Sequence, residues 1–222
     1  MAHVTNSSDA SRLVIFDVDG TLFQTEQVTV PAVTQACRAF HLEPPSRDEI
    51  CSYVGARVED YEVWLARLGG PGLASELIET ANRLELGFIR EYGRLYPGTR
   101  ETLRLLKEEG FVLAVCSNGS EPYIHEVLNT HGLMDCFSMV LLRGTLLADK
   151  TAVVGAILDA LRPRAFAVVG DREGDITAAR AHQGYAIAAA YGYGDPSEWK
   201  DADALVQSIG EVPGCLRGFW GL

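Results

Sequence analysis

The amino-acid sequence predicts an α/β fold built on a parallel sheet, with an all-helical insertion after the first strand. Short, fully apolar runs end in small or polar residues, which is typical of parallel strands covered on both faces. Segments with helical apolar spacing separate these runs over most of the chain. Between about residues 24 and 95 the alternation stops, and only helical patterns occur.

The predicted strands share one feature, a polar residue where the apolar run ends. They lie at residues 13–16, 111–116, 137–142, 166–169, 185–190 and, more weakly, 204–206. The first run ends at Asp17, the second at Ser117, and the fourth at Gly170 followed by Asp171. Because the carboxyl ends of parallel strands meet at one edge of a sheet, we expect these polar residues to converge there.

Helices are expected between the later strands. The helical patterns lie at residues 101–109, 120–132, 151–161 and 176–182. Ser120 is expected to cap the second of these helices with its side chain. Gly110 and Gly132 follow the first two patterns and are expected to close these helices.

The inserted segment is predicted to be helical throughout. Ser46 and Glu49 form a capping-box pattern. Residues 58–68 and 73–92 have helical apolar spacing, and Gly69-Gly70-Pro71-Gly72 separates them. We therefore expect a sheet core over residues 12–23 and 96–222, and a helical domain over residues 24–95.

Composition excludes several classes of partner. The 222 residues include 19 basic and 30 acidic side chains, for a net charge of −11, which repels nucleic acid and anionic membranes. Five widely spaced cysteines without a CxxC pair fit neither a disulfide framework nor a zinc site. Residues 1–12 lack the apolar segment of a signal peptide, and no apolar run has membrane-spanning length. We therefore expect a cytoplasmic protein.

Four carboxylates are predicted to meet at the polar edge of the sheet, namely Asp17, Asp19, Asp171 and Asp175. Neighbouring carboxylates raise one another's pKa, and a hard divalent cation relieves this repulsion. Mg²⁺ typically binds one or two carboxylates together with substrate phosphate oxygens. The set therefore predicts a Mg²⁺ site that serves phosphoryl transfer.

Each polar residue at this edge has an expected role. Asp17 is the predicted nucleophile, which forms an aspartyl-phosphate. Asp19 is expected to protonate the leaving oxygen and then to activate water. Ser117, Asn118 and local backbone N–H groups are expected to hold phosphate oxygens, and Lys150 to offset the charge on the phosphate and on Asp17. Asp171 completes the metal site, and Asp175 orients metal-bound water or Lys150.

These motifs resemble those of the haloacid dehalogenase-like hydrolase superfamily. Phe16-Asp17-Val18-Asp19-Gly20-Thr21-Leu22 resembles its motif I, Ser117-Asn118-Gly119 its motif II, Lys150 its motif III, and Gly170-Asp171-Arg172-Glu173-Gly174-Asp175-Ile176 its motif IV. Their order and spacing agree from residue 12 to about residue 206. The helical insertion resembles the C1 cap of the phosphoglycolate phosphatase-like branch. The resemblance implies a Rossmann-like core, Mg²⁺ dependence, a small phosphorylated metabolite as substrate, and substrate contacts from Thr21, Asn118 and Gly119.

Two features of the sequence depart from that branch or leave the substrate open. Thr151 follows Lys150 where many C1 phosphatases have proline. The cap loop that faces the substrate is expected near Val54-Gly55-Ala56-Arg57. Arg57 either binds a second anion of the substrate or is an exposed arginine at a helix start, and Arg143 is a weaker candidate for the same role.

We expect a Mg²⁺-dependent phosphatase, and we keep two alternatives. A hexose-phosphate mutase of the same superfamily retains both motif I aspartates. A receiver-like phosphoacceptor module also combines an aspartate cluster with a lysine, but the long insertion argues against it. A P-loop kinase is rejected, because Asp149 replaces the second glycine in Gly144-Thr145-Leu146-Leu147-Ala148-Asp149-Lys150-Thr151.

Overall fold

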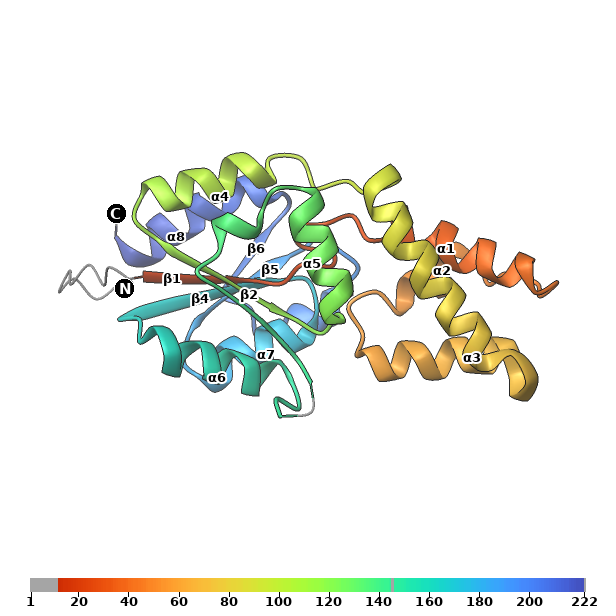
Figure 1. Cartoon of the computed structure of the whole chain (residues 1–222). Coiled ribbons are helices and arrows are strands. Elements are labelled where there is room, and N and C mark those ends of the chain that lie inside the picture. The colour runs from red at the N-terminus through yellow and green to blue at the C-terminus, as the bar shows by residue number, and fades with distance from the viewer. Residues whose placement is uncertain (1–11, 145, 222) are drawn as a thin grey trace, which may run out of the picture.

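The computed structural model describes residues 12–144 and 146–221. Residues 1–11, which carry most of the signal-peptide prediction, and Thr145 of the P-loop-like segment lie outside the described residues. The described part contains a sheet with helices on both faces and a group of helices beyond the carboxyl ends of its strands (Figure 1).

The sheet has six strands in the order β3-β2-β1-β4-β5-β6, and every neighbouring pair is parallel. The strands are β1 (Arg12–Phe16), β2 (Val112–Ser117), β3 (Met139–Leu142), β4 (Ala165–Gly170), β5 (Tyr185–Ala189) and β6 (Ala204–Val206). All six predicted strands are confirmed, with ends that differ by at most two residues from the apolar runs. This arrangement confirms the α/β prediction.

The apolar runs form strands because both faces of the sheet are covered. On β1, Val14 and Phe16 face one core cluster, whereas Leu13 and Ile15 face the other, and all four are fully buried. Each buried side chain of this size stabilises the fold by roughly 1.5–3 kcal/mol. The two clusters therefore hold β1 at the centre of the sheet, between β2 and β4.

Five helices cover the two faces of the sheet. One face carries α4 (Thr99–Glu108), α5 (Glu121–Thr130) and α8 (Val212–Trp220), and the other carries α6 (Lys150–Leu161) and α7 (Glu173–Ala181). The sequence did not predict α8, because Gly214 and Gly218 disfavour a helix interior. Burial of Val212 and Leu216 against the sheet outweighs that propensity.

The inserted segment folds into three helices with a core of their own. They are α1 (Glu26–Ala39), α2 (Arg47–Ser52) and α3 (Val58–Tyr92). Side chains such as Val33, Ile50, Leu65 and Leu77 form a third buried cluster that contains no sheet residue. These helices lie at the end of the sheet toward which the strands run (Figure 1). The division into a core and a cap over residues 24–95 stays a prediction.

Three local predictions for the helices have different outcomes. The Ser46 side chain accepts a hydrogen bond from the Glu49 backbone N–H, which confirms the predicted cap of α2. Ser120 occupies the N-cap position of α5, but its side chain makes no capping hydrogen bond, so that prediction is wrong. The predicted break in the insertion is present as a kink within α3, where Gly70 has a φ of 63°.

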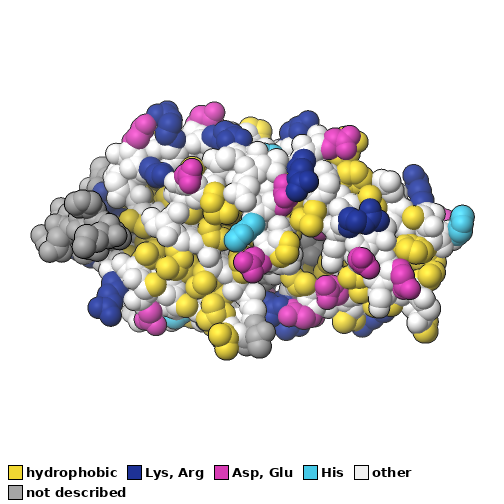
Figure 2. All heavy atoms as spheres, viewed as in Figure 1, with side chains coloured by type: hydrophobic (Ala, Val, Ile, Leu, Met, Phe, Trp, Pro, Cys, Tyr) yellow, Lys and Arg dark blue, Asp and Glu magenta, His cyan; other side chains and the backbone are white. Residues whose placement is uncertain are grey.

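The surface gives no sign of a single charged patch on the face shown in Figure 2, where acidic and basic side chains are interspersed over both the sheet and the cap. Among the described residues, none of the helices combines the length and apolarity required to cross a bilayer.

Candidate active site

Three neighbouring strands place the predicted catalytic residues at one edge of the sheet. Asp17 directly follows β1, Ser117 ends β2, and Asp171 directly follows β4. Since β1 lies between β2 and β4, these three side chains come from adjacent strands. Each of them is at most 1% exposed, so their charges and hydrogen bonds act in a poorly hydrated environment.

Lys150 is the cation of this edge. Its Nζ lies 2.8 Å from Oδ2 of Asp17 and 2.7 Å from Oδ1 of Asp175. Asp149 places Lys150 at the start of α6, because the Asp149 side chain accepts a hydrogen bond from the Ala152 backbone N–H. Burial alone would lower the pKa of Lys150, but Asp17 and Asp175 raise it above its ordinary value. Lys150 is therefore a permanent cation at neutral pH.

Three carboxylates lie close enough to hold a metal ion. Asp17, Asp171 and Asp175 offer ligand oxygens that all lie within 4.8 Å of one another. Oδ1 of Asp171 is buried and has no hydrogen-bond partner among the described residues. Burial, followed by the charges of Asp17 and Asp175, raises the pKa of Asp171 well above its ordinary value. Lys150 balances only one of the three charges, so the donors present fit one divalent cation.

Contacts around Asp171 fix its backbone and its Oδ2 and leave Oδ1 without a hydrogen bond among the described residues. The Tyr193 backbone N–H donates to its Oδ2 at 2.7 Å, and the Trp199 indole N–H donates to its backbone carbonyl at 2.6 Å. Gly20 has a φ of +74°, and a Cβ built there would lie 2.2 Å from Oδ2 of Asp171. A side chain at position 20 would therefore push Asp171 out of the cluster.

Asp19 faces away from the three-carboxylate cluster. Its Oδ1 accepts hydrogen bonds from the hydroxyl of Thr25 at 2.6 Å and from the hydroxyl of Tyr123 at 2.7 Å. Burial, followed by the charge of Asp17, raises the pKa of Asp19 to about 6. A carboxyl group with this pKa is partly protonated near neutral pH and can both give and take a proton. The metal-binding role expected for the Asp19 side chain stays a prediction.

The other predicted site residues lie around this edge in different settings. The Ser117 hydroxyl accepts a hydrogen bond from the Gly119 backbone N–H at 3.1 Å, which fixes the turn after β2. The Asn118 amide donates to the Gly55 carbonyl of the cap at 3.0 Å. Thr21 is fully buried, and its hydroxyl has no partner among the described residues. The phosphate contacts expected from these residues stay predictions.

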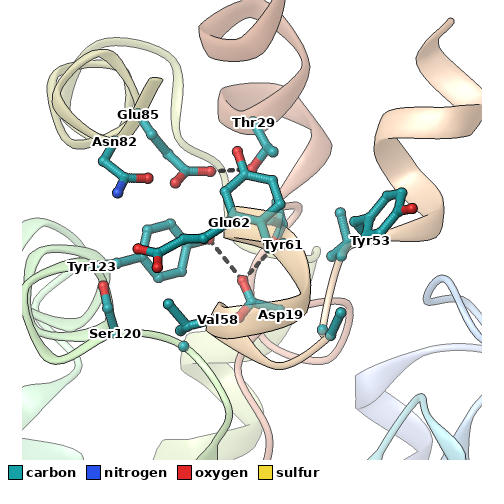
Figure 3. A pocket seen from close by; sticks show the side chains of 15 residues that line it. Asp19, Thr29, Tyr53, Val58, Tyr61, Glu62, Asn82, Glu85, Ser120 and Tyr123 are labelled. Atoms are coloured by element: carbon teal, nitrogen blue, oxygen red, sulfur yellow. Dashed lines mark hydrogen bonds between the residues drawn. The ribbon is translucent and has the colours of Figure 1, made fainter. Parts of the chain in front are cut away.

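A cavity lies between Asp19 and the cap (Figure 3), and we call it the Asp19 cavity. Its volume is about 100 Å³, and the polar side chains that line it include Asp19, Thr29, Tyr61, Glu62, Asn82 and Glu85. Burial raises the pKa of Glu85 to about 7, and the Thr29 hydroxyl donates to its Oε1. The sequence does not predict that this cavity is lined by Tyr61, Glu62, Asn82 and Glu85, because no local sequence pattern shows which face of α3 meets the sheet.

A second cavity, which we call the Lys150 cavity, is lined by basic side chains, whereas the described lining of the Asp19 cavity has none. It measures about 260 Å³, and Lys150, Asn118, Arg57 and Arg143 line it. The structure thus brings four predicted residues together. The Arg57 guanidinium donates to both oxygens of Asp60, at 2.6 and 2.9 Å, and Arg143 forms an ion pair with Glu59. Both arginines are therefore already paired with acidic residues in the first turn of α3.

Comparisons with known proteins agree with this geometry. The model of a family described as haloacid dehalogenase-like hydrolase matches residues 14–189. A phosphoglycolate phosphatase of Chromobacterium violaceum is 31% identical, over 90% of this chain and 94% of that protein. Among solved structures, a haloacid dehalogenase-like hydrolase of Streptococcus pneumoniae is similar, with a TM-score of 0.80 at 18% identity, over 93% of this chain and 98% of that one. Protein Tyrosine Kinase A of Mycobacterium tuberculosis is also similar, with a TM-score of 0.73 at 26% identity, over 96% of this chain and 100% of that one. The chain belongs to the haloacid dehalogenase-like hydrolase family, in its phosphoglycolate phosphatase-like branch.

Proposed function

We propose that this protein is a Mg²⁺-dependent phosphatase that hydrolyses a small phosphomonoester through an aspartyl-phosphate on Asp17. The observation that carries the proposal is that Asp17 and Asp19, two aspartates of one turn, have different surroundings. Asp17 is ion-paired with Lys150 beside the three-carboxylate cluster, whereas Asp19 lines the cavity under the cap with its pKa raised to about 6. A nucleophile must be held in position and a general acid must hold a proton. The contact with Lys150 positions Asp17, and the raised pKa of Asp19 favours its protonated form.

The first half-reaction transfers the phosphoryl group to Asp17. A carboxylate oxygen of Asp17 attacks phosphorus, and the bond from phosphorus to the ester oxygen breaks. The proton held by Asp19 passes to that oxygen, so the leaving group departs as a neutral alcohol. Lys150, whose Nζ lies 2.8 Å from Oδ2 of Asp17, holds the nucleophile in position.

The second half-reaction returns the enzyme to its starting state. Asp19, now ionised, takes a proton from water, and the water oxygen attacks the phosphorus of the aspartyl-phosphate. The bond from phosphorus to Asp17 breaks and inorganic phosphate leaves. The Thr25 and Tyr123 hydroxyls hold Asp19 in place through both steps.

The metal and phosphate contacts complete the proposed site. Asp17, Asp171 and Asp175 would hold the Mg²⁺ ion. When bound, the ion supplies positive charge that offsets the negative charge of the transferring phosphoryl group. Ser117, Asn118 and Gly119 follow the strand next to Asp17 and would hold phosphate oxygens. The Asn118 amide and the Gly119 N–H would then exchange their present acceptors, the Gly55 carbonyl and the Ser117 hydroxyl, for the phosphate.

A panel of phosphorylated metabolites with Mg²⁺ tests the proposal, scored for inorganic phosphate and for isomerised product. We expect stoichiometric release of phosphate from at least one small phosphomonoester, and none with Asp17→Asn under the same conditions. Isomerised product without phosphate would assign the chain as a mutase instead. Stable phosphorylation without turnover would assign it as a phosphoacceptor module.

A further inference from the structure

We propose that the leaving group of the substrate carries hydrogen-bond donors and no negative charge, as in a phosphorylated polyol or amino alcohol. The inference rests on the proposed phosphatase function and adds the substrate class. It departs from the activity for which the relatives are named, because the leaving group of 2-phosphoglycolate carries a carboxylate. The reason lies in the side chains of the Asp19 cavity.

The position of Asp19 decides which cavity receives the leaving group. The proton donor must stand beside the ester oxygen, and the rest of the leaving group extends from that oxygen. Asp19 lines the Asp19 cavity and does not line the Lys150 cavity. The leaving group therefore occupies the space between Asp19 and α3, while Lys150 and Asn118 stay on the phosphate side.

The charge of the Asp19 cavity opposes a carboxylate. None of the fifteen described residues that line it is Lys, Arg or His, whereas Glu62, Glu85 and Asp19 each contribute a carboxyl group. A substrate carboxylate brought into this space would meet Glu62 and, above about pH 7, Glu85 as like charges, and no cation among the described lining residues would offset it. Juxtaposed like charges reject a ligand more strongly than a missing contact does.

Two carboxyl groups of the cavity away from the reacting centre, Glu62 and Glu85, offer acceptor oxygens to a ligand. Glu85 uses Oε1 to accept from Thr29, and its Oε2 has no hydrogen bond among the described residues. Figure 3 shows Glu85 and Asn82 on α3 and Tyr123 on α5 around one space, with Glu62 beside them. Carboxylate oxygens only accept, so they require hydroxyl or ammonium donors from the ligand.

Two further groups suit a hydroxyl-bearing or ammonium-bearing ligand. The Tyr61 hydroxyl oxygen is buried and has no partner among the described residues, so it is available to the ligand as donor and acceptor. The Asn82 amide offers both kinds of group. With a volume of about 100 Å³, the cavity suits a leaving group of a few heavy atoms.

The arginines of the Lys150 cavity do not alter this assignment. Arg57 is bound to both oxygens of Asp60, and Arg143 is paired with Glu59, so each already has an anionic partner. Neither arginine lines the Asp19 cavity. A substrate carboxylate in the Asp19 cavity could contact Arg57 or Arg143 only if that arginine left its acidic partner and moved out of the Lys150 cavity.

Three two-carbon substrates of similar size test the inference with the purified full-length protein and Mg²⁺. These are 2-hydroxyethyl phosphate, O-phosphoethanolamine and 2-phosphoglycolate, which differ only in a terminal hydroxymethyl, aminomethyl or carboxylate group. We expect kcat/KM for at least one of the first two to exceed that for 2-phosphoglycolate by tenfold or more. The better of these two identifies the leaving group as a polyol or an amino alcohol. A kcat/KM for 2-phosphoglycolate equal to or above both would overturn the inference.

Variants of the cavity acids tie the preference to these residues. Glu62→Gln and Glu85→Gln keep the shape of the side chain and remove a charge. Each variant should lower the ratio of kcat/KM for the preferred substrate to kcat/KM for 2-phosphoglycolate by threefold or more. Glu79→Gln, an exposed position on the same helix, should leave this ratio unchanged. An unchanged ratio in both cavity variants would also overturn the inference. Turnover of p-nitrophenyl phosphate serves as the reference. If the wild-type protein does not hydrolyse this compound, the result counts against the phosphatase function and not against the substrate class.

Discussion

The Lys150 ammonium lies 2.8 Å from Oδ2 of Asp17, and both side chains are almost completely buried. This contact joins the start of α6 to the end of β1, across more than half of the sequence. A buried ion pair of this kind holds its members in one orientation, and removal of one partner leaves an uncompensated charge. We therefore expect the loss of this contact to lower both the free energy of unfolding and the rate of the proposed reaction.

Lys150→Met is expected to damage both stability and catalysis. The substitution leaves Asp17, Asp171 and Asp175 without their buried cation, which costs about 3–5 kcal/mol in the metal-free protein. Mg²⁺ should restore part of the loss, because it offsets the same charges. Thermal unfolding with and without Mg²⁺ measures this effect. We also expect kcat to fall by about 100-fold or more. Equal Tm values for variant and wild type without Mg²⁺ would contradict the charge argument.

Asp171→Asn should weaken Mg²⁺ binding, because it removes charge from the carboxylate whose Oδ1 has no other partner among the described residues. Isothermal titration of the metal-free protein with Mg²⁺ measures the affinity, and we expect a loss of about tenfold or more. Asp159→Asn, an exposed position on α6, is the matched control. Removal of divalent cations should stop turnover, and added Mg²⁺ should restore it. Unchanged affinity in Asp171→Asn would reject the metal assignment.

Tyr123→Phe should shift the pH dependence of turnover. The Tyr123 hydroxyl donates to the ionised form of Asp19 and so lowers the pKa of that group. Without this bond the pKa of Asp19 rises above about 6. With p-nitrophenyl phosphate, whose leaving group needs no proton, activity requires ionised Asp19 for the water step. The rising limb of the pH–kcat profile should therefore move to higher pH. An unmoved limb would show that Tyr123 does not act through Asp19.

The cluster of predicted residues at the sheet edge could be recognised from the sequence because each follows a short apolar run. Asp17, Ser117 and Asp171 end buried strands, and the order of those strands places them side by side. The ion pair between Arg57 and Asp60 also has a local signal, since residues three apart on a helix are neighbours. Both features can be predicted because they depend only on the periodicity of apolar residues and on the spacing between residues in the sequence.

The cap-facing half of the site could not be predicted in the same way. Glu85 and Tyr123 line the Asp19 cavity together only because α3 packs against α5. Their position depends on how two separately formed apolar clusters dock, and no local pattern encodes that docking. The Tyr193 and Trp199 contacts with Asp171 are likewise long-range, from the segment after β5.

Glu85 should make the stability of the protein depend on pH. Burial raises its pKa from 4.5 to about 7, so the folded protein binds a proton that the unfolded chain releases near pH 4.5. The stabilisation is fully present below pH 4.5 and is lost as the pH rises through about 7, by up to about 3 kcal/mol. Glu85→Gln should therefore be more stable than wild type above pH 7, with the difference shrinking as the pH falls. Denaturant unfolding at several pH values measures this, with exposed Glu79→Gln as control. A difference that does not depend on pH would contradict the assignment.

The most direct test of the account is a burst experiment with Asp19→Ala and p-nitrophenyl phosphate in the presence of Mg²⁺. This leaving group departs without a proton, so the first half-reaction should proceed, whereas the water step lacks its base. We predict release of one equivalent of p-nitrophenolate per site, followed by a stall, and a phosphoryl group on Asp17 by peptide mass spectrometry. The doubly substituted Asp17→Asn, Asp19→Ala protein should give no burst. A burst in that double variant, or a phosphoryl group found on another residue, would contradict the assignment of Asp17 as the nucleophile.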